Sequence, residues 1–332
     1  MFSRKSFIAG VAAAAALAPA QRARAADAPI RIGYSAWPGW FPWKVAEAKG
    51  LSAKNGVNVE MVWFDDYTAS ISALSAGKID GNSETTNDAI SAQAGGAPRK
   101  IVLTTDNSYG NDQVIAKAGI ADPRGLTGKN VAVEFGLVDH FLLLLALQKA
   151  GVPQSAVHIK ALPTDKAAAA FAGGKVDSCA VFAPFTTAAM KTGLGHVIAS
   201  SKDFPGAIPD HLVLSPSLVA SRPADVQKIV KTWFDTLAYI GANRSEAVAI
   251  MAKRAAVSPA DYLSYDKGTR IFNVRDNVEA FAPGSTIKHL AESGKMMSAF
   301  LLKAGLTKTS VSVDSMLDGQ FVKAYAATHS TA

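Results

Sequence analysis

The pattern of apolar and polar positions divides the chain into short strands that are each followed by a helix. Strand-like apolar runs occupy residues 30–34 and 57–63, and helical spacing follows over 43–54 and 67–75. A Gly-Lys-Ile-Asp segment at 77–80 then ends the second helix and leads into a third short strand. Strands that alternate with helices in this order predict a parallel, doubly wound α/β sheet.

The same order of elements returns in the middle of the chain. Strands are predicted over 129–134 and 157–162, and helices over 140–150 and from Asp165 onward. A second Gly-Lys-(Ile/Val)-Asp segment, at 174–177, lies 97 positions after the first. The repeat therefore predicts two α/β lobes with doubly wound sheets.

Residues after 218 follow a different pattern. Helices are predicted over 222–242, 245–256, 286–304 and 314–327, with no third copy of the repeat. We expect this helical block to pack on the first lobe, so that lobe 1 comprises 26–114 plus 215–332 and lobe 2 comprises 115–214. The chain would then cross between lobes near 113–117 and 211–219, and two such crossovers make a hinge.

The first 25 residues have the features of a cleavable signal peptide. Arg4-Lys5 precede an apolar stretch over 7–20, and Ala23-Arg24-Ala25 supplies the small-x-small pattern of a cleavage site. Cleavage after Ala25 predicts a periplasmic protein, exported by either the general or the twin-arginine route. The apolar stretch and all later ones are shorter than a membrane-spanning helix requires, so no membrane insertion is expected.

Charge and cysteine content narrow the class of protein. The chain carries a formal charge of +7, but four basic residues lie in the signal peptide, which leaves 30 basic against 27 acidic residues. A net charge of +3 gives little support to nucleic-acid binding. One cysteine, Cys179, excludes a disulfide framework, and the histidines include no His-x-x-x-His pair. No metal or other cofactor is expected.

Common enzyme motifs are incomplete in this sequence. Residues 33–37 miss the last glycine of a Gly-x-Ser-x-Gly elbow, residues 125–129 are too short for a phosphate-binding loop, and residues 193–195 lack the third glycine of a dinucleotide fingerprint. Cys179 lies on a predicted buried strand, where a cysteine is usually a small core residue. The sequence therefore predicts a protein without enzymatic activity.

Four segments together resemble a known family of transport proteins. They are Ile32-Gly33-Tyr34-Ser35-Ala36-Trp37, Gly77-Lys78-Ile79-Asp80-Gly81-Asn82, Val131-Ala132-Val133-Glu134-Phe135-Gly136 and Gly174-Lys175-Val176-Asp177. This series is similar to the nitrate/sulfonate/taurine family of solute-binding proteins, which is related to the thiamine-precursor binders. The resemblance implies a monomer with the type II periplasmic binding protein fold. It also implies closure on a small solute and delivery to the permease and ATPase of an ABC importer.

Ligands of open α/β sheets bind beyond the carboxyl ends of the strands, which selects the loops after each predicted strand. Structural alternatives stay open for several residues in these loops. The tryptophans could pack against the helical block, Asp66 and Asp139 could be helix N-caps, His140 could sit on a first helical turn, and Asp210 could brace a turn. The predicted ligand-binding residues are Trp37, Trp40, Asp66, Asn82, Glu84, Gly136, Asp139, His140, Phe182 and Asp210.

Charge within these loops favours a cationic solute. They carry seven carboxylates and one fixed cation, Lys44. A like-charge contact at about 4 Å costs on the order of 4 kcal/mol at an effective dielectric constant of 20. Aromatic faces and carboxylates suit a small guanidinium-like or amine-bearing solute. The alternatives are a sulfonate, taurine, nitrate or a urea-like amide, an enzyme of the thiamine-precursor type, and a sensor subunit for a receptor kinase.

Overall fold

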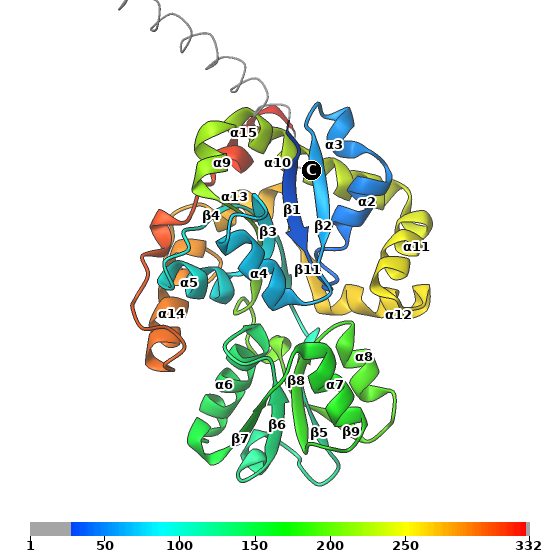
Figure 1. Cartoon of the computed structure of the whole chain (residues 1–332), viewed down its shortest axis with the longest axis vertical. Coiled ribbons are helices and arrows are strands. Elements are labelled where there is room, and N and C mark those ends of the chain that lie inside the picture. Colours follow the sequence, from blue (N-terminus) through cyan, green and yellow to red (C-terminus); the bar gives the residue numbers. More distant parts are fainter. Residues whose placement is uncertain (1–27, 330–332) are drawn as a thin grey trace, which may run out of the picture.

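The computed structural model describes residues 28–329 as two α/β lobes (Figure 1), so the predicted signal peptide lies outside the described residues. The first sheet has the strand order β11-β4-β10-β3-β1-β2, and the second has the order β7-β6-β8-β5-β9. The first sheet contains β1 (Ile30–Tyr34), β2 (Val59–Trp63), β3 (Gly81–Thr85), β4 (Lys100–Ser108), β10 (Pro209–Leu214) and β11 (Thr269–Ile271). The second contains β5 (Asp112–Lys117), β6 (Asn130–Val133), β7 (His158–Ala161), β8 (Ser178–Phe182) and β9 (Gly195–Ser200).

The two sheets share one arrangement, as the sequence repeat predicts. In the first, β1 pairs in parallel with β2 and β3, and β3 pairs with the antiparallel strand β10. In the second, β6 pairs in parallel with β7 and β8, and β8 pairs with the antiparallel strand β5. Strands β5 and β10 are each the first strand after the chain crosses from one sheet to the other. Each of them pairs with the parallel strand that is last in the chain order of its sheet, β8 for β5 and β3 for β10.

The chain changes sheets earlier than the predicted crossings at 113–117 and 211–219. Residues 112–114 already belong to β5 of the second sheet, and residues 209–214 form β10 of the first. The linking segments are therefore 109–111 and 204–208. The reason is that β10 finds its hydrogen-bonding partners in β3 and β4, which both belong to the first sheet.

Helices cover both sheets. The amino-terminal part contains α2 (Pro42–Ala48), α3 (Leu51–Lys54), α4 (Tyr67–Ser75) and α5 (Thr86–Ala94), and the second lobe contains α6 (Val138–Ala150), α7 (Thr164–Ala172) and α8 (Phe185–Met190). The helix predicted over 43–54 is thus two helices, because Gly50 adopts a left-handed φ of 61° between them.

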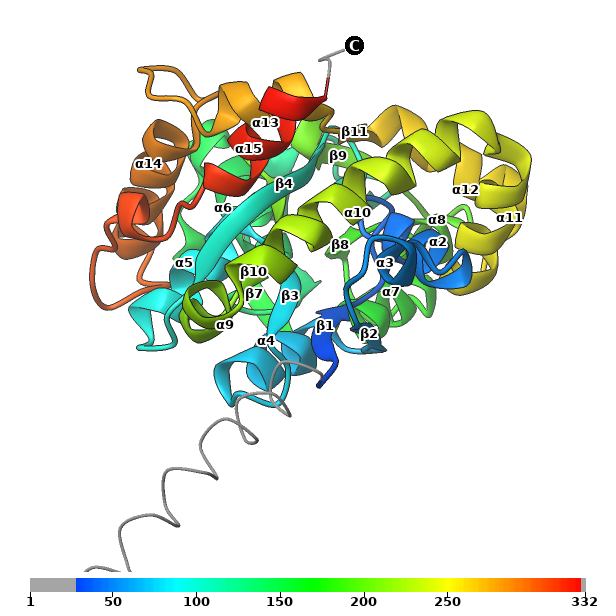
Figure 2. The ribbon, with the colours of Figure 1, turned by 90° about the horizontal axis from the view of Figure 1, so that it is seen from above.

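The carboxy-terminal helices pack on the first lobe, and Figure 2 shows the long helix α10 running beside its strands. Trp43 of α2 contacts Trp233 of α10 with ring centroids 4.8 Å apart. This contact fixes the loop after β1 against the helical block. The block comprises α9 (Pro216–Ser221), α10 (Pro223–Ala242), α11 (Arg244–Ala255), α12 (Pro259–Ser264), α13 (Val274–Ala280), α14 (Leu290–Lys303) and α15 (Gln320–Thr328).

Candidate functional site

A cavity of about 10 Å³ lies between the two lobes. Its walls come from the ends of strands and from the start of helices in both lobes, as the open-sheet rule leads us to expect. This is about the space of one water molecule, so the surrounding side chains must move apart to admit a solute. The lining residues are Trp37, Trp40, Tyr67, Thr85, Asp112, Val138, Phe182, Ile208 and Asp210.

Aromatic rings from both lobes form four of the nine lining residues of the cavity. Trp37 contacts Phe182 edge to face with ring centroids 6.1 Å apart, and Trp40 contacts Tyr67 at 5.2 Å. Tyr67 and Phe182 stand perpendicular to each other at 6.5 Å. The two tryptophans come from the loop after β1, and Phe182 ends β8. Closure of the lobes therefore completes one aromatic enclosure.

Carboxyl groups supply the polar part of the cavity. Asp210 of β10 is paired across the sheet with Asp106 of β4, and Asp112 begins β5. Asp106 accepts hydrogen bonds from Trp37 Nε1 and Thr105 Oγ1, both at 2.9 Å. Asp112 Oδ2 and Asp210 Oδ2 are buried and have no hydrogen-bond partner among residues 28–329. Two acceptor oxygens, one from each lobe, therefore lack a donor at the cavity.

The carboxyl groups around the cavity resist ionisation. Burial raises the pKa of Asp112 to about 7 and that of Asp88, on α5, to about 8. Burial and the neighbouring Asp106 raise the pKa of Asp210 well above its usual range, and burial also raises that of Asp106. No Lys or Arg lines the cavity in the described part of the chain. No basic side chain of the cavity lining therefore stabilises the ionised forms of these carboxyl groups.

No group of three or more His, Cys, Asp or Glu residues within 28–329 has an arrangement that could hold a metal ion.

Gly39 makes room for one of these carboxyl groups. A Cβ atom at Gly39 would lie 2.0 Å from Asp106 Oδ2, too close for both atoms to keep their places. We expect Gly39→Ala to displace the Asp106 side chain and to break its bond to Trp37. Calorimetry should then show an affinity for the solute at least about tenfold lower than that of the parent. A tenfold loss corresponds to roughly one charge-assisted hydrogen bond. Gly241→Ala on α10 is the control, because nothing lies within 4 Å of its added Cβ. An unchanged affinity in Gly39→Ala would contradict this role.

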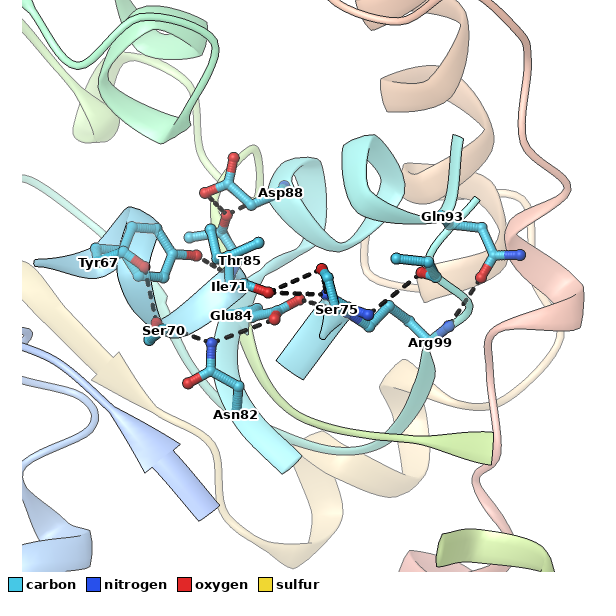
Figure 3. Close-up of polar contacts among 11 residues, drawn as sticks. Tyr67, Ser70, Ile71, Ser75, Asn82, Glu84, Thr85, Asp88, Gln93 and Arg99 are labelled. Carbon is cyan, nitrogen blue, oxygen red and sulfur yellow. Dashed lines mark hydrogen bonds and ion pairs between the residues drawn. The ribbon is translucent and has the colours of Figure 1, made fainter. Parts of the chain in front are cut away.

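Two predicted ligand residues, Asn82 and Glu84, lie outside the cavity lining, in the polar network of Figure 3. Asn82 Nδ2 donates to Ser70 Oγ at 2.9 Å and to Glu84 Oε1 at 3.2 Å. Glu84 Oε2 accepts from Arg99 Nε at 3.2 Å, and both charged side chains are almost fully buried. Neither Asn82 nor Glu84 lines the cavity. Their side chains instead connect β3 to α4 and to the start of β4.

The network also reaches the cavity wall. The Thr85 amide donates to the Tyr67 hydroxyl oxygen at 3.1 Å, and Thr85 Oγ1 donates to Asp88 Oδ2 at 2.8 Å. Figure 3 shows Tyr67, Thr85 and Asp88 following one another along this edge of the first lobe. The network therefore holds the side of the aromatic enclosure that belongs to the first lobe.

We expect Arg99→Met to destabilise the protein because it leaves the Glu84 carboxylate buried without its cation. Breaking one partner of a buried ion pair costs about 3–5 kcal/mol, which urea unfolding can measure. The double variant Arg99→Met with Glu84→Gln removes both charges and should recover much of that loss. Equal stabilities of the single variant and the parent would contradict the expectation.

The predicted residues of the second lobe lie mostly outside the cavity. Helix α6 begins at Val138 with Leu137 as its N-cap, so the expected N-cap role of Asp139 is wrong. Asp139 is instead buried in the first turn, where its Oδ2 accepts from Thr164 Oγ1 at 3.0 Å. His140 Nδ1 accepts from the Gly136 amide at 3.1 Å, and burial lowers the His140 pKa to about 4. Gly136 and His140 therefore bond to each other rather than line the cavity.

A second cavity of about 20 Å³ lies beside the first, and we call it the mouth cavity. Asp66 lines it and also caps α4 by accepting from the Ala69 amide at 3.1 Å. Thr68 Oγ1 donates to Glu134 Oε1 at 2.5 Å across the two lobes. The mouth cavity is lined by Ser35, Ala36, Asp65, Asp66, Tyr67, Glu134, Pro163, Thr164, Asp165, Phe182 and Phe185.

The structure thus brings together four predicted residues at the inner cavity and one at its mouth. Trp37, Trp40, Phe182 and Asp210 line the inner cavity, and Asp66 lines the mouth. Sequence reasoning missed Asp106 and Asp112, together with Tyr67 and Thr85. The polar run from Thr104 to Asp112 directly after an apolar strand is the signal that could have located the two aspartates.

Two similar α/β lobes with a small polar and aromatic cavity between them define the fold class of the two-lobed periplasmic binding proteins. A family model for the NMT1-like family matches residues 23–256, and the chain belongs to this family. The resemblance to the nitrate/sulfonate/taurine binding proteins is thereby confirmed.

Individual relatives agree with this assignment. The taurine-binding periplasmic protein of Escherichia coli is 26% identical over 272 residues, which cover 77% of this chain and 84% of the relative. The solved alkanesulfonate-binding protein of Xanthomonas axonopodis, bound to MOPS, superimposes with a TM-score of 0.76 at 19% identity, covering 88% of this chain and 98% of that one. The periplasmic nitrate-binding protein of Synechocystis gives a TM-score of 0.72 at 15% identity, covering 92% and 89%. At such identities the two structures establish the fold alone.

Proposed function

We propose that this protein captures a small nitrogen-containing cation, guanidinium-like or amine-bearing, between its lobes. The observation that carries the proposal is that Asp112 and Asp210 line the aromatic cavity and that each has a buried Oδ2 without a hydrogen-bond partner among the described residues. A planar cation with several N–H groups would donate to both oxygens while its face lies against the rings of Trp37 and Trp40.

Electrostatics supports a cation over an anion at this position. Where these carboxyl groups are ionised, each contact of a unit charge with one of them at about 4 Å is worth on the order of 4 kcal/mol at a dielectric constant of 20, favourable for a cation and unfavourable for an anion. Among the described residues, no Lys or Arg lines the cavity that could offset the repulsion of an anion. A cation would also compensate carboxylates that burial otherwise keeps protonated.

We further propose that the protein works in the periplasm and delivers its solute to the permease and ATPase of an ABC importer. The E. coli relative is named as a periplasmic binding protein, and the fold belongs to that class. No helix within residues 28–329 is long and apolar enough to cross a membrane. The Cys179 thiol is buried, and burial raises its pKa, so it lacks the properties of a nucleophile.

Isothermal titration calorimetry with a panel of small solutes tests the proposal. Guanidinium and methylammonium should bind at least about 100-fold more tightly than urea, a difference of about 2.7 kcal/mol. Urea is the matched control because it has nearly the same shape as guanidinium without the charge. Methanesulfonate and nitrate should not bind. Tight binding confined to the anions would refute the proposal.

An anionic or zwitterionic solute is the second candidate. The named relatives favour it, and so does one local observation, because the buried Trp40 Nε1 donor has no acceptor among the described residues. A sulfonate oxygen could accept from this indole. Taurine would in addition place an ammonium group near the carboxylates, so it belongs in the same titration panel.

A further inference from the structure

We infer that the mouth cavity is a second, outer binding site for the same cationic solute, occupied before the lobes close. This inference rests on the proposed function. Its first basis is charge from both lobes. Asp65 and Asp66 follow β2 on one side, and Glu134 and Asp165 lie across from them. A cation that approaches the closing lobes therefore meets carboxylates on both sides before it reaches the inner cavity.

Few basic groups balance this charge. Lys166 lies 3.0 Å from Asp165 in an exposed pair, and the Arg254 guanidinium stacks on the Trp63 ring, whose Nε1 donates to Asp65. Asp66 and Glu134 form no ion pair with a described residue, and the nearby Asp66 and Asp165 add to the burial that raises the Glu134 pKa. The mouth therefore retains a negative field that attracts cations.

Ser35 provides an independent observation. Its side chain lines the mouth cavity and is only 1% exposed, yet its Oγ has no hydrogen-bond partner among residues 28–329. Ser35 directly follows β1, next to the loop that carries the inner tryptophans. An unpartnered hydroxyl in this place can accept a hydrogen bond from a solute N–H group that passes toward the inner cavity.

Two rings separate the outer site from the inner one. Tyr67 and Phe182 line both cavities and meet edge to face with centroids 6.5 Å apart. Tyr67 belongs to the first lobe and Phe182 to the second, so this wall exists only when the lobes meet. The solute would rest among the mouth carboxylates while the lobes are apart, and closure would then bring the rings together behind it.

Stopped-flow mixing with guanidinium chloride, followed by intrinsic tryptophan fluorescence, tests the outer site. The double variant Asp65→Asn with Asp66→Asn keeps the acceptor for Trp63 and the helix cap, since Asn caps as well as Asp. At an ionic strength of about 10 mM we expect its association rate constant to be ~10-fold below that of the parent, with a flatter dependence on salt. Binding at the outer site should appear as a fast first phase of the fluorescence change that saturates with guanidinium concentration. Ser35→Ala should weaken the apparent affinity of this phase several-fold.

The control is Glu60→Gln with Asp314→Asn, two exposed carboxylates outside both cavities, which changes the net charge by the same amount. It should associate like the parent at every salt concentration. If the mouth variant and the control associate at equal rates while guanidinium affinity is retained, the outer site is refuted and the proposed function stands. If the parent does not bind guanidinium at all in calorimetry, the proposed function fails, and this inference fails with it.

Discussion

Asparagine at both Asp112 and Asp210 is expected to reduce guanidinium affinity by at least about 1,000-fold, and asparagine at either position alone by about 100-fold. Loss of one buried charge from a hydrogen-bonded pair costs roughly 2–5 kcal/mol, and these two groups would contact the same ligand. Asparagine keeps the side-chain volume and one acceptor oxygen, so the lost affinity reports the charge. Calorimetry on the three variants and the parent measures the effect.

The same variants should gain stability without ligand. Asp112 and Asp210 are buried, and the described residues give them no compensating cation. Removing such a group should add about 1–3 kcal/mol to the free energy of unfolding at pH 8, which urea titration can follow. The variants should then bind guanidinium more weakly than the parent and yet be more stable. A misfolded variant would lose both affinity and stability. Retained guanidinium affinity in the double variant would contradict the proposed role of both carboxylates.

The parallel core of each lobe could be predicted from the sequence because its strands are apolar and short. The runs at 30–34 and 129–134 became β1 and β6, and both lobes keep the predicted order. Strand β4 was missed, and β10 was expected only as a strand-like crossing between lobes, because buried polar residues interrupt their apolar pattern. Asp106 and Asp210 are such residues. The buried polar residues that make these strands hard to predict are therefore also the residues that form the polar part of the site.

Position in a loop did not distinguish residues that face the cavity from residues that lie below it. Asn82 and Glu84 lie on the same face of β3 and bond to each other, whereas Thr85 on the other face lines the cavity. A buried partner distant in sequence, Arg99, takes up the Glu84 charge. Pairing of this kind depends on tertiary packing, so counting carboxylates in loops overestimates those available to a solute.

The charge of the cavity separates this chain from what the names of its relatives suggest. Nitrate and alkanesulfonates carry negative charge, and the fold is shared with proteins named for binding them. Fold similarity does not fix the ligand, because specificity depends on a few side chains at the site. Here Asp106, Asp112 and Asp210 lie together at the junction of the two lobes, on β4, β5 and β10. These three positions are therefore the ones to compare when solute specificity is assigned within the family.

Affinity for guanidinium is expected to rise as the pH increases from 5 to 8. Burial raises the pKa of Asp112 to about 7, and burial with the neighbouring Asp106 raises that of Asp210 well above its usual range, so closed lobes hold protons that a bound cation must displace. For each proton released, the affinity increases about tenfold per pH unit below these values and levels off above them. Calorimetry in buffers of different ionisation enthalpy counts the protons. An anionic solute would bind more weakly as the pH rises, so the sign of the slope separates the two candidates.

Stability of the ligand-free protein should change in the opposite direction. A carboxyl group whose pKa is higher in the folded than in the unfolded protein stabilises the fold fully below about pH 4, the unfolded pKa, and this contribution is lost as the pH rises through 7 to 8. The melting temperature should therefore fall between pH 5 and pH 8, and saturating guanidinium should restore it. Asp112→Asn should flatten the fall because its amide does not titrate. A ligand-free melting temperature that rises over this range would show that these carboxyl groups are already compensated.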